Sequence, residues 1–350
     1  MSVSVEVASD VVEAACLPRL IRLAPNLVGA AFDVMKMLPA AHMVDEAIRE
    51  GRIGPGTTVI DTTSGTFGLG LAMVCALRGL RLHLVSDPAV EGFLAQRLMD
   101  LGAELTVVRE PAADGGFQAA RLAVVEQLCA RYPDHFVPSQ YGNVNNPLAY
   151  AAVAEQIAQV VGDVAYLVGP VGSGGSMCGT ARALRSVFPS LRAVGVDTHH
   201  SRLFGQQDGP RLLRGLGNSL LPSNLDHTVF DEVHWVDASP AYAATRALHR
   251  QHALYMGPTS GAAYLVAKHL ARRREGTVVT LLPDAGHRYE ATVYDNTWLA
   301  GVCPDLRLDD RLPTDPEMVT AVPMRGEGWQ AMAWERRSLH DVLADQDGKS

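Results

Sequence analysis

The sequence predicts an α/β fold with mostly parallel sheets. Short apolar segments rich in β-branched residues alternate with helix-length segments along most of the 350 residues. Several of the turns that follow a predicted strand are rich in glycine, serine and threonine, as expected where a strand leads into a helix. No internal repeat or low-complexity segment interrupts this alternation. The length allows two lobes, each with its own core.

The first series of strand–helix units occupies the N-terminal half. A helix is expected over residues 40–50, because Gly51 ends the pattern. The β-branched strand 57–61 leads through a loop rich in serine and threonine into a helix over 69–78. The further elements expected in this series are strands at 80–85 and 104–108 and helices at 90–101 and 117–132.

A second series begins near Asn146-Pro147. Its predicted strands are 165–168, 192–196 and 277–282, and its predicted helices are 148–161, a segment that ends at Ser186, 240–251 and 262–274. The region 201–226 is irregular and rich in Gly, Pro and Asn, and such loops often carry substrate specificity. Beyond Cys303 the pattern weakens, although Trp329 and Trp334 indicate that the tail still packs.

Composition describes a globular protein and excludes several classes. Hydrophobic residues make up 47% and charged residues 19% of the chain. The net charge of −8 argues against a nucleic-acid surface, which requires a basic face. The run Arg272-Arg273-Arg274 is at a predicted helix end, where it complements the helix dipole. Without a signal-peptide pattern or an apolar run of membrane length, we expect a cytoplasmic protein with no membrane partner.

Cysteines and histidines predict neither disulfides nor a metal site. The five cysteines are far apart and contain no C-x-x-C pair, which is typical of reduced thiols in a cytosolic chain. The closest histidine pairs, His199-His200 and His249-x-x-His252, have no carboxylate or cysteine at ligand spacing. We therefore expect no bound metal.

Lys36 is one of only three lysines, and the other two are Lys268 and Lys349. Arginine supplies positive charge elsewhere, but arginine cannot form a Schiff base and lysine can. Lys36 lies in the apolar segment 32–38. The ordinary reading is a lysine that extends its amine to water from an amphipathic helix. The chemical reading is a reactive amine.

A glycine-rich loop, Gly172-Ser173-Gly174-Gly175-Ser176, lies between a predicted strand and a helix. Glycines let backbone N–H groups approach an anion, and the start of a helix adds a favourable dipole. A tight turn without a ligand is the alternative. Three glycines and two serines in five residues favour a phosphate site.

Two more hydroxyl-bearing turns could take part in binding. The loop 62–68 could hold a carboxylate through amides and hydroxyls, and the turn 257–261 precedes the helix 262–274. Either turn could instead be an ordinary helix N-cap. Taken together, a reactive lysine, a phosphate loop, a carboxylate loop and a hydroxyl turn are the parts of a pyridoxal phosphate enzyme.

The order of these motifs resembles the cysteine synthase and cystathionine β-synthase family, the fold-type-II pyridoxal phosphate-dependent enzymes. The resemblance runs from about residue 24 to 299. Lys36 stands where the family has its Schiff-base lysine, 27 positions before Thr63. Residues 63–68, Thr-Ser-Gly-Thr-Phe-Gly, resemble the T-S-G-N-T-G loop that binds the substrate carboxylate. Residues 140–147, Gln-Tyr-Gly-Asn-Val-Asn-Asn-Pro, resemble Q-F-x-N-P-x-N-P.

Three further motifs follow in the family's order. Residues 172–176 resemble the G-T-G-G-T phosphate loop, and Thr259 matches the serine that contacts the pyridine nitrogen. Residues 283–289, Pro-Asp-Ala-Gly-His-Arg-Tyr, resemble P-D-S-G-E-R-Y. The resemblance implies two three-layer αβα lobes, similar to the tryptophan synthase β fold, with pyridoxal 5'-phosphate in the cleft between them. It also implies a homodimer.

The lobes implied by the resemblance are 24–147, with the lysine and the carboxylate loop, and 148–302, with the phosphate loop. Residues 1–23 are expected to pack on the second lobe, and 303–350 form a C-terminal extension. Lys36 is the implied catalytic residue, which holds the cofactor and moves the substrate α-proton. The implied cofactor ligands are Lys36, Thr66, Gly172, Ser173, Gly174, Gly175, Ser176 and Thr259. The implied substrate ligands are Thr63, Ser64, Gly65, Thr66 and Gln140.

The chain departs from the family at several of these positions. The family's S-x-K-D-R reads Val34-Met-Lys-Met-Leu38, and His287 replaces a glutamate. The loop asparagine is Thr66, and the next threonine is Phe67, which adds bulk near the carboxylate site. These changes leave cofactor binding in place but depart from an ordinary O-acetylserine sulfhydrylase.

The resemblance implies β-replacement on an activated L-serine, such as O-acetylserine or O-phosphoserine, by way of an aminoacrylate. The nucleophile is a small molecule, either sulfide, a thiol or an amine, as in relatives that make precursors of diaminopropionate. A β-eliminating lyase that resembles cysteine desulfhydrase or serine dehydratase is one alternative. A non-catalytic relative that binds the cofactor is another.

Overall fold

The structure is a computed structural model that describes residues 7–347 except 64, 89, 91, 114, 309, 310 and 325. The chain forms two compact units. The first consists of residues 1–18 and 32–139, and the second of residues 19–31 and 140–350. Each unit contains a sheet in which most neighbouring strands are parallel, so the predicted α/β fold is confirmed.

The first unit is built on a four-stranded sheet in the order β5-β4-β3-β6, parallel throughout. Its strands are β3 (Thr58–Thr62), β4 (Arg81–Ser86), β5 (Ala103–Val107) and β6 (His135–Phe136). Every residue of β3 is buried. A continuously buried strand is typical of a parallel sheet that is covered on both faces.

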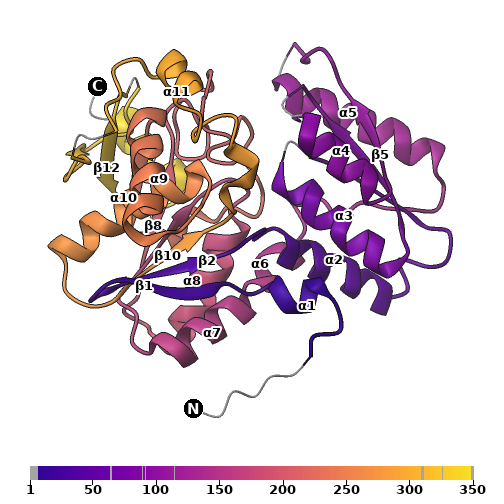
Figure 1. The fold of residues 1–350 in the computed structure, drawn as a ribbon, viewed down its shortest axis with the longest axis horizontal. Helices are drawn as coiled ribbons and strands as arrows, with labels where there is room; N and C mark the ends of the chain where they lie inside the picture. The colour runs from indigo at the N-terminus through magenta and orange to yellow at the C-terminus, as the bar shows by residue number, and fades with distance from the viewer. Residues whose placement is uncertain are drawn as a thin grey trace. The chain divides into compact units, whose positions relative to one another are not determined.

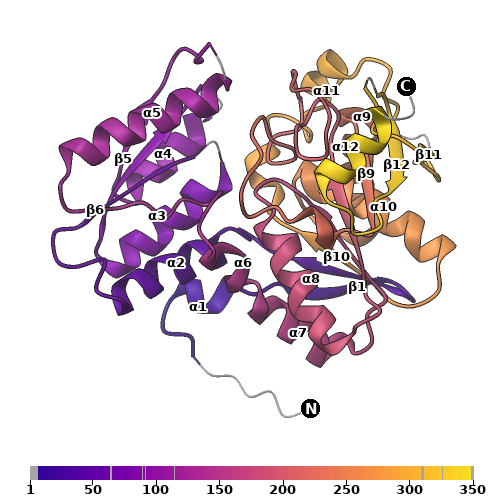
Figure 2. The same ribbon diagram turned by 180° about the vertical axis from the view of Figure 1, so that it is seen from behind.

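Helices cover both faces of this sheet. The helices of the first unit are α1 (Val11–Ala15), α2 (Met37–Arg49), α3 (Thr66–Arg78), α4 (Gly92–Asp100) and α5 (Gly116–Arg131). Val59 and Leu82 pack in one cluster with α2, α3 and α4, whereas Ile60 and Val85 pack with α5. Because successive strand residues face opposite sides, this division produces three layers (Figures 1 and 2).

The second unit is built on an eight-stranded sheet in the order β1-β2-β10-β7-β8-β9-β12-β11. Its strands are β1 (Arg19–Ala24), β2 (Leu27–Ala31), β7 (Tyr166–Pro170), β8 (Arg192–Asp197), β9 (Glu232–Val236), β10 (Val278–Leu282), β11 (Glu317–Met318) and β12 (Trp329–Ala333). Only the β1–β2 and β9–β12 pairs are antiparallel among the described strands of this sheet. Both of these pairs lie toward the edges.

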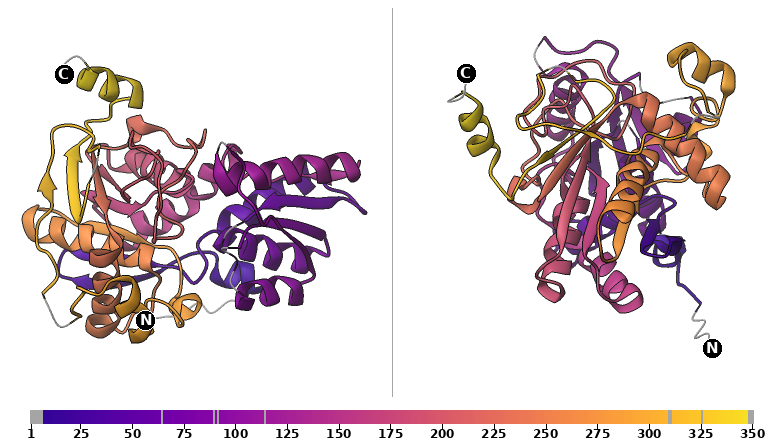
Figure 3. Two further views of the ribbon diagram at one scale, coloured as in Figure 1. Left: turned by 90° about the horizontal axis from the view of Figure 1, so that it is seen from above. Right: turned by 90° about the vertical axis from the view of Figure 1, so that its left-hand side faces the viewer.

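The helices of the second unit are α6 (Asn145–Ala149), α7 (Ala151–Val161), α8 (Gly175–Val187), α9 (Ala238–His252), α10 (Pro258–Arg273), α11 (Asn296–Val302) and α12 (Leu339–Asp347), with 3-10 turns at His227–Val229 and Gly286–Tyr289. Helices α9 and α10 pack together over one face of the sheet, and α7 and α8 lie on the opposite side (Figure 1). Helix α12 follows β12 at the end of the chain (Figure 3). This unit also has three layers.

The structure differs from the sequence expectations in several elements. Strands β1, β2 and β9 were not expected, and the helix expected over 148–161 is two helices that meet at Tyr150. Residues 19–31 belong to the second unit because β2 pairs with β10, so that Val28 lies opposite Val279. The division falls after Ser139 and not after residue 147, and residues 303–350 are part of the second unit.

The tail packs as Trp329 and Trp334 indicated. Trp329 is 6% exposed and lies in β12, and Trp334 is fully buried. The five cysteines, all in the described part of the chain, are free thiols, as expected. None of the described helices is long and apolar enough to cross a membrane. The described residues contain no group of His, Cys, Asp and Glu that could hold a metal ion.

Candidate active site

Lys36 caps the start of α2 and is partly buried. Helix α3 passes close to its backbone at Gly70. A Cβ added to Gly70 would lie 2.7 Å from the Cα of Met37 and 3.0 Å from the carbonyl carbon of Lys36. The close approach of α3 to α2 therefore requires glycine at position 70, and it places the start of the carboxylate-loop helix beside the lysine.

The Thr63 hydroxyl organises the loop that precedes α3. It accepts hydrogen bonds from the backbone N–H of Gly65 at 3.1 Å and of Gly68 at 2.9 Å. A Cβ at Gly68 would lie 2.5 Å from this hydroxyl oxygen. Thr63 is 1% exposed, and its hydroxyl accepts from an N–H of the first turn of α3, whose N-cap residue is Gly65. This helix-start role is close to the ordinary reading of the loop. A role for its hydroxyl toward a substrate carboxylate stays a prediction.

The start of α3 still offers donors to an anion. The backbone N–H groups of Thr66 and Phe67, in the first turn, donate to no residue that the structure describes. The N-terminus of a 13-residue helix attracts negative charge through these groups and the helix dipole. Ser64, a predicted substrate ligand, lies outside the described residues. The N–H of Gly65 is already bound by Thr63.

The expectation that Phe67 adds bulk near the carboxylate site is wrong. The side chain of Phe67 is 2% exposed and belongs to the apolar core formed by α2, α3 and α4. Apolar burial in this core stabilises the aromatic ring. Phe67 therefore explains how α3 is anchored.

The phosphate loop connects β7 to α8, as expected, and its glycines are required by close contacts. Gly174 has a φ of +82°, and a Cβ there would lie 2.6 Å from the Cα of Leu225. A Cβ at Gly175 would overlap the side chain of Asn146. None of the backbone N–H groups of residues 172–176 donates to a described residue. Unpaired amides at the start of a 13-residue helix form a site that fits a phosphate group.

The backbone of Gln140 is bound by residues beside the phosphate loop. It lies in the second unit, whereas Thr63 lies in the first. Its backbone carbonyl accepts hydrogen bonds from the side-chain amides of Asn146 at 2.5 Å and Asn224 at 3.1 Å. Asn146 also abuts Gly175. These amides therefore tie the backbone of Gln140 to the phosphate loop.

Thr259 lies in the first turn of α10, which begins at Pro258, and not in a turn before the helix. Proline suits this first position because its φ is preset for a helix. Thr259 is 4% exposed, and Gly215 lies between it and the phosphate loop. A Cβ at Gly215 would lie 3.6 Å from Cγ2 of Thr259, and a Cβ at Gly172 would lie 3.3 Å from the carbonyl oxygen of Gly215. The predicted phosphate and ring contacts thus converge around Gly215.

Comparison with known proteins agrees with this geometry. Residues 33–284 match the family described as pyridoxal-phosphate dependent enzyme. The chain belongs to this family. Like other members, it is an enzyme that depends on pyridoxal phosphate, with the cysteine synthase-like fold-type-II architecture.

Two relatives share the name N-(2-amino-2-carboxyethyl)-L-glutamate synthase. The protein from Ralstonia nicotianae is 36% identical over 272 residues, which cover 77% of this chain and 80% of the relative. The protein from Cupriavidus metallidurans is 34% identical over 296 residues, which cover 83% and 86%. Both alignments span most of the two proteins.

Solved structures show the same fold. A hydrogen sulfide-producing enzyme from Fusobacterium nucleatum matches with a TM-score of 0.75 and 26% identity, over 81% of this chain and 100% of that one. An O-acetylserine dependent cystathionine beta-synthase from Helicobacter pylori matches with a TM-score of 0.75 and 26% identity, over 82% and 99%. The cysteine synthase-like resemblance is thereby confirmed.

The described residues fit the family's cofactor in each unit. The first unit supplies a lysine at the start of α2, and the second supplies the glycine cradle with Thr259 beside it. Sequence reasoning missed Gly215 and Asn224, which shape that cradle. The signal available was the Gly215-x-Gly217 pair in the irregular region 201–226, where both glycines have positive φ.

A cysteine near the phosphate loop is not an alternative nucleophile. Cys178 lies in the first turns of α8, and burial raises the pKa of its thiol to about 11. A thiol with this pKa is protonated at neutral pH, and the thiolate is the reactive form. Cys178 is therefore not a candidate for the nucleophile of this site.

Proposed function

We propose that this enzyme replaces the β-substituent of an activated L-serine, such as O-phosphoserine or O-acetylserine, with the amino group of L-glutamate. The product would be N-(2-amino-2-carboxyethyl)-L-glutamate. The observation that carries this proposal is the match to two relatives of that name, at 34–36% identity over 77–83% of the chain. The altered loop around Thr66 supports a nucleophile other than that of an ordinary cysteine synthase.

The residues of the phosphate loop would hold the cofactor through its phosphate, by the N–H groups of Gly172 to Ser176 and the hydroxyls of Ser173 and Ser176. Thr259 would place a neutral hydroxyl at the pyridine nitrogen. Bound pyridoxal phosphate supplies a carbonyl that bonds to amines and a conjugated ring that stabilises negative charge at the substrate α-carbon.

Lys36 would hold the cofactor through Nζ before the substrate arrives, and the same nitrogen would then accept the α-proton. The N–H groups of Thr66 and Phe67 would orient the substrate carboxylate. Gln140 would add an amide from the second unit. Each role uses a group that the described structure places at a helix start or in a buried loop.

An acidic nucleophile requires local positive charge in a chain with a net charge of −8. Arg214 is exposed and precedes Gly215, the residue that lies between Thr259 and the phosphate loop. We propose that Arg214 attracts a carboxylate of glutamate. An arginine fork suits carboxylate oxygens because it can donate two parallel hydrogen bonds.

Attachment of the cofactor can be tested with the two described lysines. The purified protein should be yellow, and borohydride reduction should fix the cofactor to the peptide that contains Lys36. Lys36→Ala should lose the colour and the labelled peptide. Lys268→Ala is the matched control and should keep both. A colourless wild-type protein that takes up no added pyridoxal phosphate would contradict the proposed cofactor.

The reaction can be tested by mass spectrometry. The enzyme is incubated with O-phosphoserine or O-acetylserine, and with glutamate, sulfide or no nucleophile. We expect the glutamate adduct to form faster than cysteine. Pyruvate release at the same rate without a nucleophile would instead support a lyase, and cysteine as the main product would support a sulfhydrylase. No turnover of any substrate by yellow protein would support a non-catalytic relative.

A further inference from the structure

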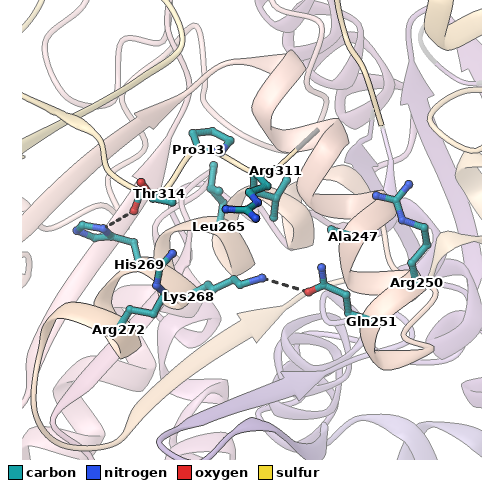
Figure 4. Close-up of a pocket in the computed structure, with 11 residues that line it drawn as sticks. Ala247, Arg250, Gln251, Leu265, Lys268, His269, Arg272, Arg311, Pro313 and Thr314 are labelled. Atoms are coloured by element: carbon teal, nitrogen blue, oxygen red, sulfur yellow. Dashed lines mark hydrogen bonds between the residues drawn. The ribbon is translucent and has the colours of Figure 1, made fainter. Parts of the chain in front are cut away.

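A pocket of about 400 Å³ lies in the second unit, and none of the residues that line it belongs to the glycine cradle. Two walls are helix faces: Ala247, Arg250 and Gln251 from α9, and Leu265, Lys268, His269 and Arg272 from α10. The α9 residues lie three and four positions after Ala247, and the α10 residues three, four and seven positions after Leu265, so each set shares one helix face. The third wall is the segment 311–314 (Figure 4).

The lining of this cationic pocket is strongly basic. It contains Arg250, Lys268, Arg272 and Arg311, and none of its lining residues is an aspartate or glutamate. Arg272 and Arg311 make no hydrogen bond or ion pair with any residue that the structure describes. The amine of Lys268 donates to Gln251 at 3.1 Å, and Arg250 donates to the carbonyl of Leu308. No carboxylate in the described part of the chain pairs with any of these four cations, although the protein has a net charge of −8.

The like charges of this lining repel one another. Burial and the charge of Arg272 lower the pKa of Lys268. Asp315 is nearby, but it pairs with Arg273, with two hydrogen bonds at 2.8 and 3.0 Å, and does not line the pocket. Asp315 is therefore paired with Arg273, and its Oδ1 also lies 3.2 Å from Nδ1 of His269, which lines the pocket.

A purely structural role explains these cations only in part. Arg250 and Arg272 lie in the last turns of their helices, where positive charge complements the dipole. This reason does not extend to Arg311, which lies outside any helix. The wall that carries Arg311 is held in place by a hydrogen bond between His269 Nδ1 and the carbonyl of Thr314 at 2.9 Å. The cations thus come from three separate segments.

We propose that this cationic pocket binds a small molecule with two or more negatively charged oxygens, supplied by phosphate or carboxylate groups. Its volume lies within the ordinary range of small-molecule sites. Gln251 and Thr314 add neutral polar groups beside the four cations. Segment 311–314 lies beyond residues 33–284, the part that matches the family, so the C-terminal segment of this chain completes the site. A bound anion would hold this segment against α10.

Calorimetry on the protein saturated with pyridoxal phosphate tests this proposal, because the cofactor then occupies the phosphate loop. Pyrophosphate and citrate are the two probes, and acetate is the monovalent control. All titrations use one ionic strength, because salt screens charge. We expect saturable binding of at least one probe, and the preferred probe distinguishes phosphate from carboxylate groups as the natural chemistry.

Variants locate the binding. Arg272→Gln and Arg311→Gln should each weaken binding about tenfold, the usual scale for loss of one charge-assisted contact. Arg274→Gln removes the same charge two positions from Arg272 but does not line the pocket, and it should leave binding unchanged. Thermal melts check folding, and Arg272 is the safer variant because it has no described partner. Absence of saturable binding, or equal weakening in all three variants, would overturn the proposal.

Discussion

At the scale of single residues, Asp197 is unusual because it is fully buried at the end of β8. Its Oδ1 accepts a hydrogen bond from the N–H of Thr198 at 2.8 Å, and its Oδ2 has no partner among the described residues. Burial raises the pKa of Asp197 from 3.8 to about 7. The carboxyl group is therefore held as a neutral acid at mildly acidic pH, in the segment that leads toward Gly215.

This pKa predicts that the protein loses stability as pH rises. The folded state keeps a proton that the unfolded chain releases above about pH 4, so the penalty grows up to about pH 7 and is complete above it. Between pH 5 and 8 we expect Asp197 to lower the free energy of unfolding by up to about 3 kcal/mol. In urea titrations, Asp197→Asn should lack this slope. Asp100→Asn, an exposed change, should retain it, and a slope in both variants would count against Asp197.

The prediction that is most specific to the proposed reaction concerns the binding of glutamate by Arg214. Arg214→Gln should raise the KM for glutamate about tenfold or more, because a charged hydrogen bond is lost, and should leave the yellow colour unchanged. Arg202→Gln is the control, since Arg202 is also exposed in the same irregular region. An unchanged KM for glutamate in Arg214→Gln would remove Arg214 from the proposed binding site.

The roles of individual residues could be predicted only in part from the sequence. The scarcity of lysine and the glycine loop were visible in the chain itself. The direction of Phe67 was not, because a loop residue and a buried residue of a first helical turn look alike without the partner helix. The burial of Asp197 could not be predicted either, since the neighbouring residues in the sequence do not indicate that its carboxyl group is fully buried.

At the scale of elements, contact between α2 and α3 controls the position of Lys36. Gly70 lies in the middle of α3, where alanine would normally be preferred by about 1 kcal/mol. Its replacement by alanine should nevertheless destabilise the protein, because the new Cβ would lie 2.7 Å from the Cα of Met37. The two helices would have to separate at the lysine.

Gly70→Ala should therefore lower the free energy of unfolding by about 1–3 kcal/mol and weaken retention of the cofactor. Gly301→Ala is a matched control in α11, because a Cβ there would meet no atom within 4 Å. That control should be neutral or slightly stabilising. Denaturant titration and the visible absorbance of each variant provide the measurements, and a Gly70→Ala protein as stable and as yellow as the control would refute the argument.

Elements with strong local patterns were predicted well. Strand 57–61 and helix 117–132 lie within one residue of β3 and α5. The strands β1 and β2 were missed because their partners are remote, and β2 is stabilised by β10 near the other end of the chain. The start of α10 at Pro258 was missed because Pro258 reads as a helix breaker, although proline is favoured at a first helical position.

At the scale of the whole molecule, the four tryptophans all belong to the second unit. They are Trp235, Trp298, Trp329 and Trp334. The first unit has its own core, which includes the fully buried Leu71. Tryptophan fluorescence should therefore follow unfolding of the second unit, whereas far-UV circular dichroism follows helices in both.

Leu71→Ala should remove about 2–5 kcal/mol from the first core. The dichroism transition should then begin at lower denaturant while the fluorescence transition stays in place. If both probes moved together in Leu71→Ala, the two units would unfold as one, and the expectation of separate cores would be wrong.

The parallel pairing of β2 with β10 has a consequence for synthesis. Val28 cannot pair with Val279 until Val279 has emerged from the ribosome. At ordinary rates of translation, the interval between synthesis of these two residues is on the order of 10–50 s. Residues 32–139, which complete the first unit, emerge well within that interval. During it, the apolar β2 has only its hairpin partner β1. The nascent chain therefore carries an open strand edge for most of its translation, and this is the stage at which a chaperone would be most useful.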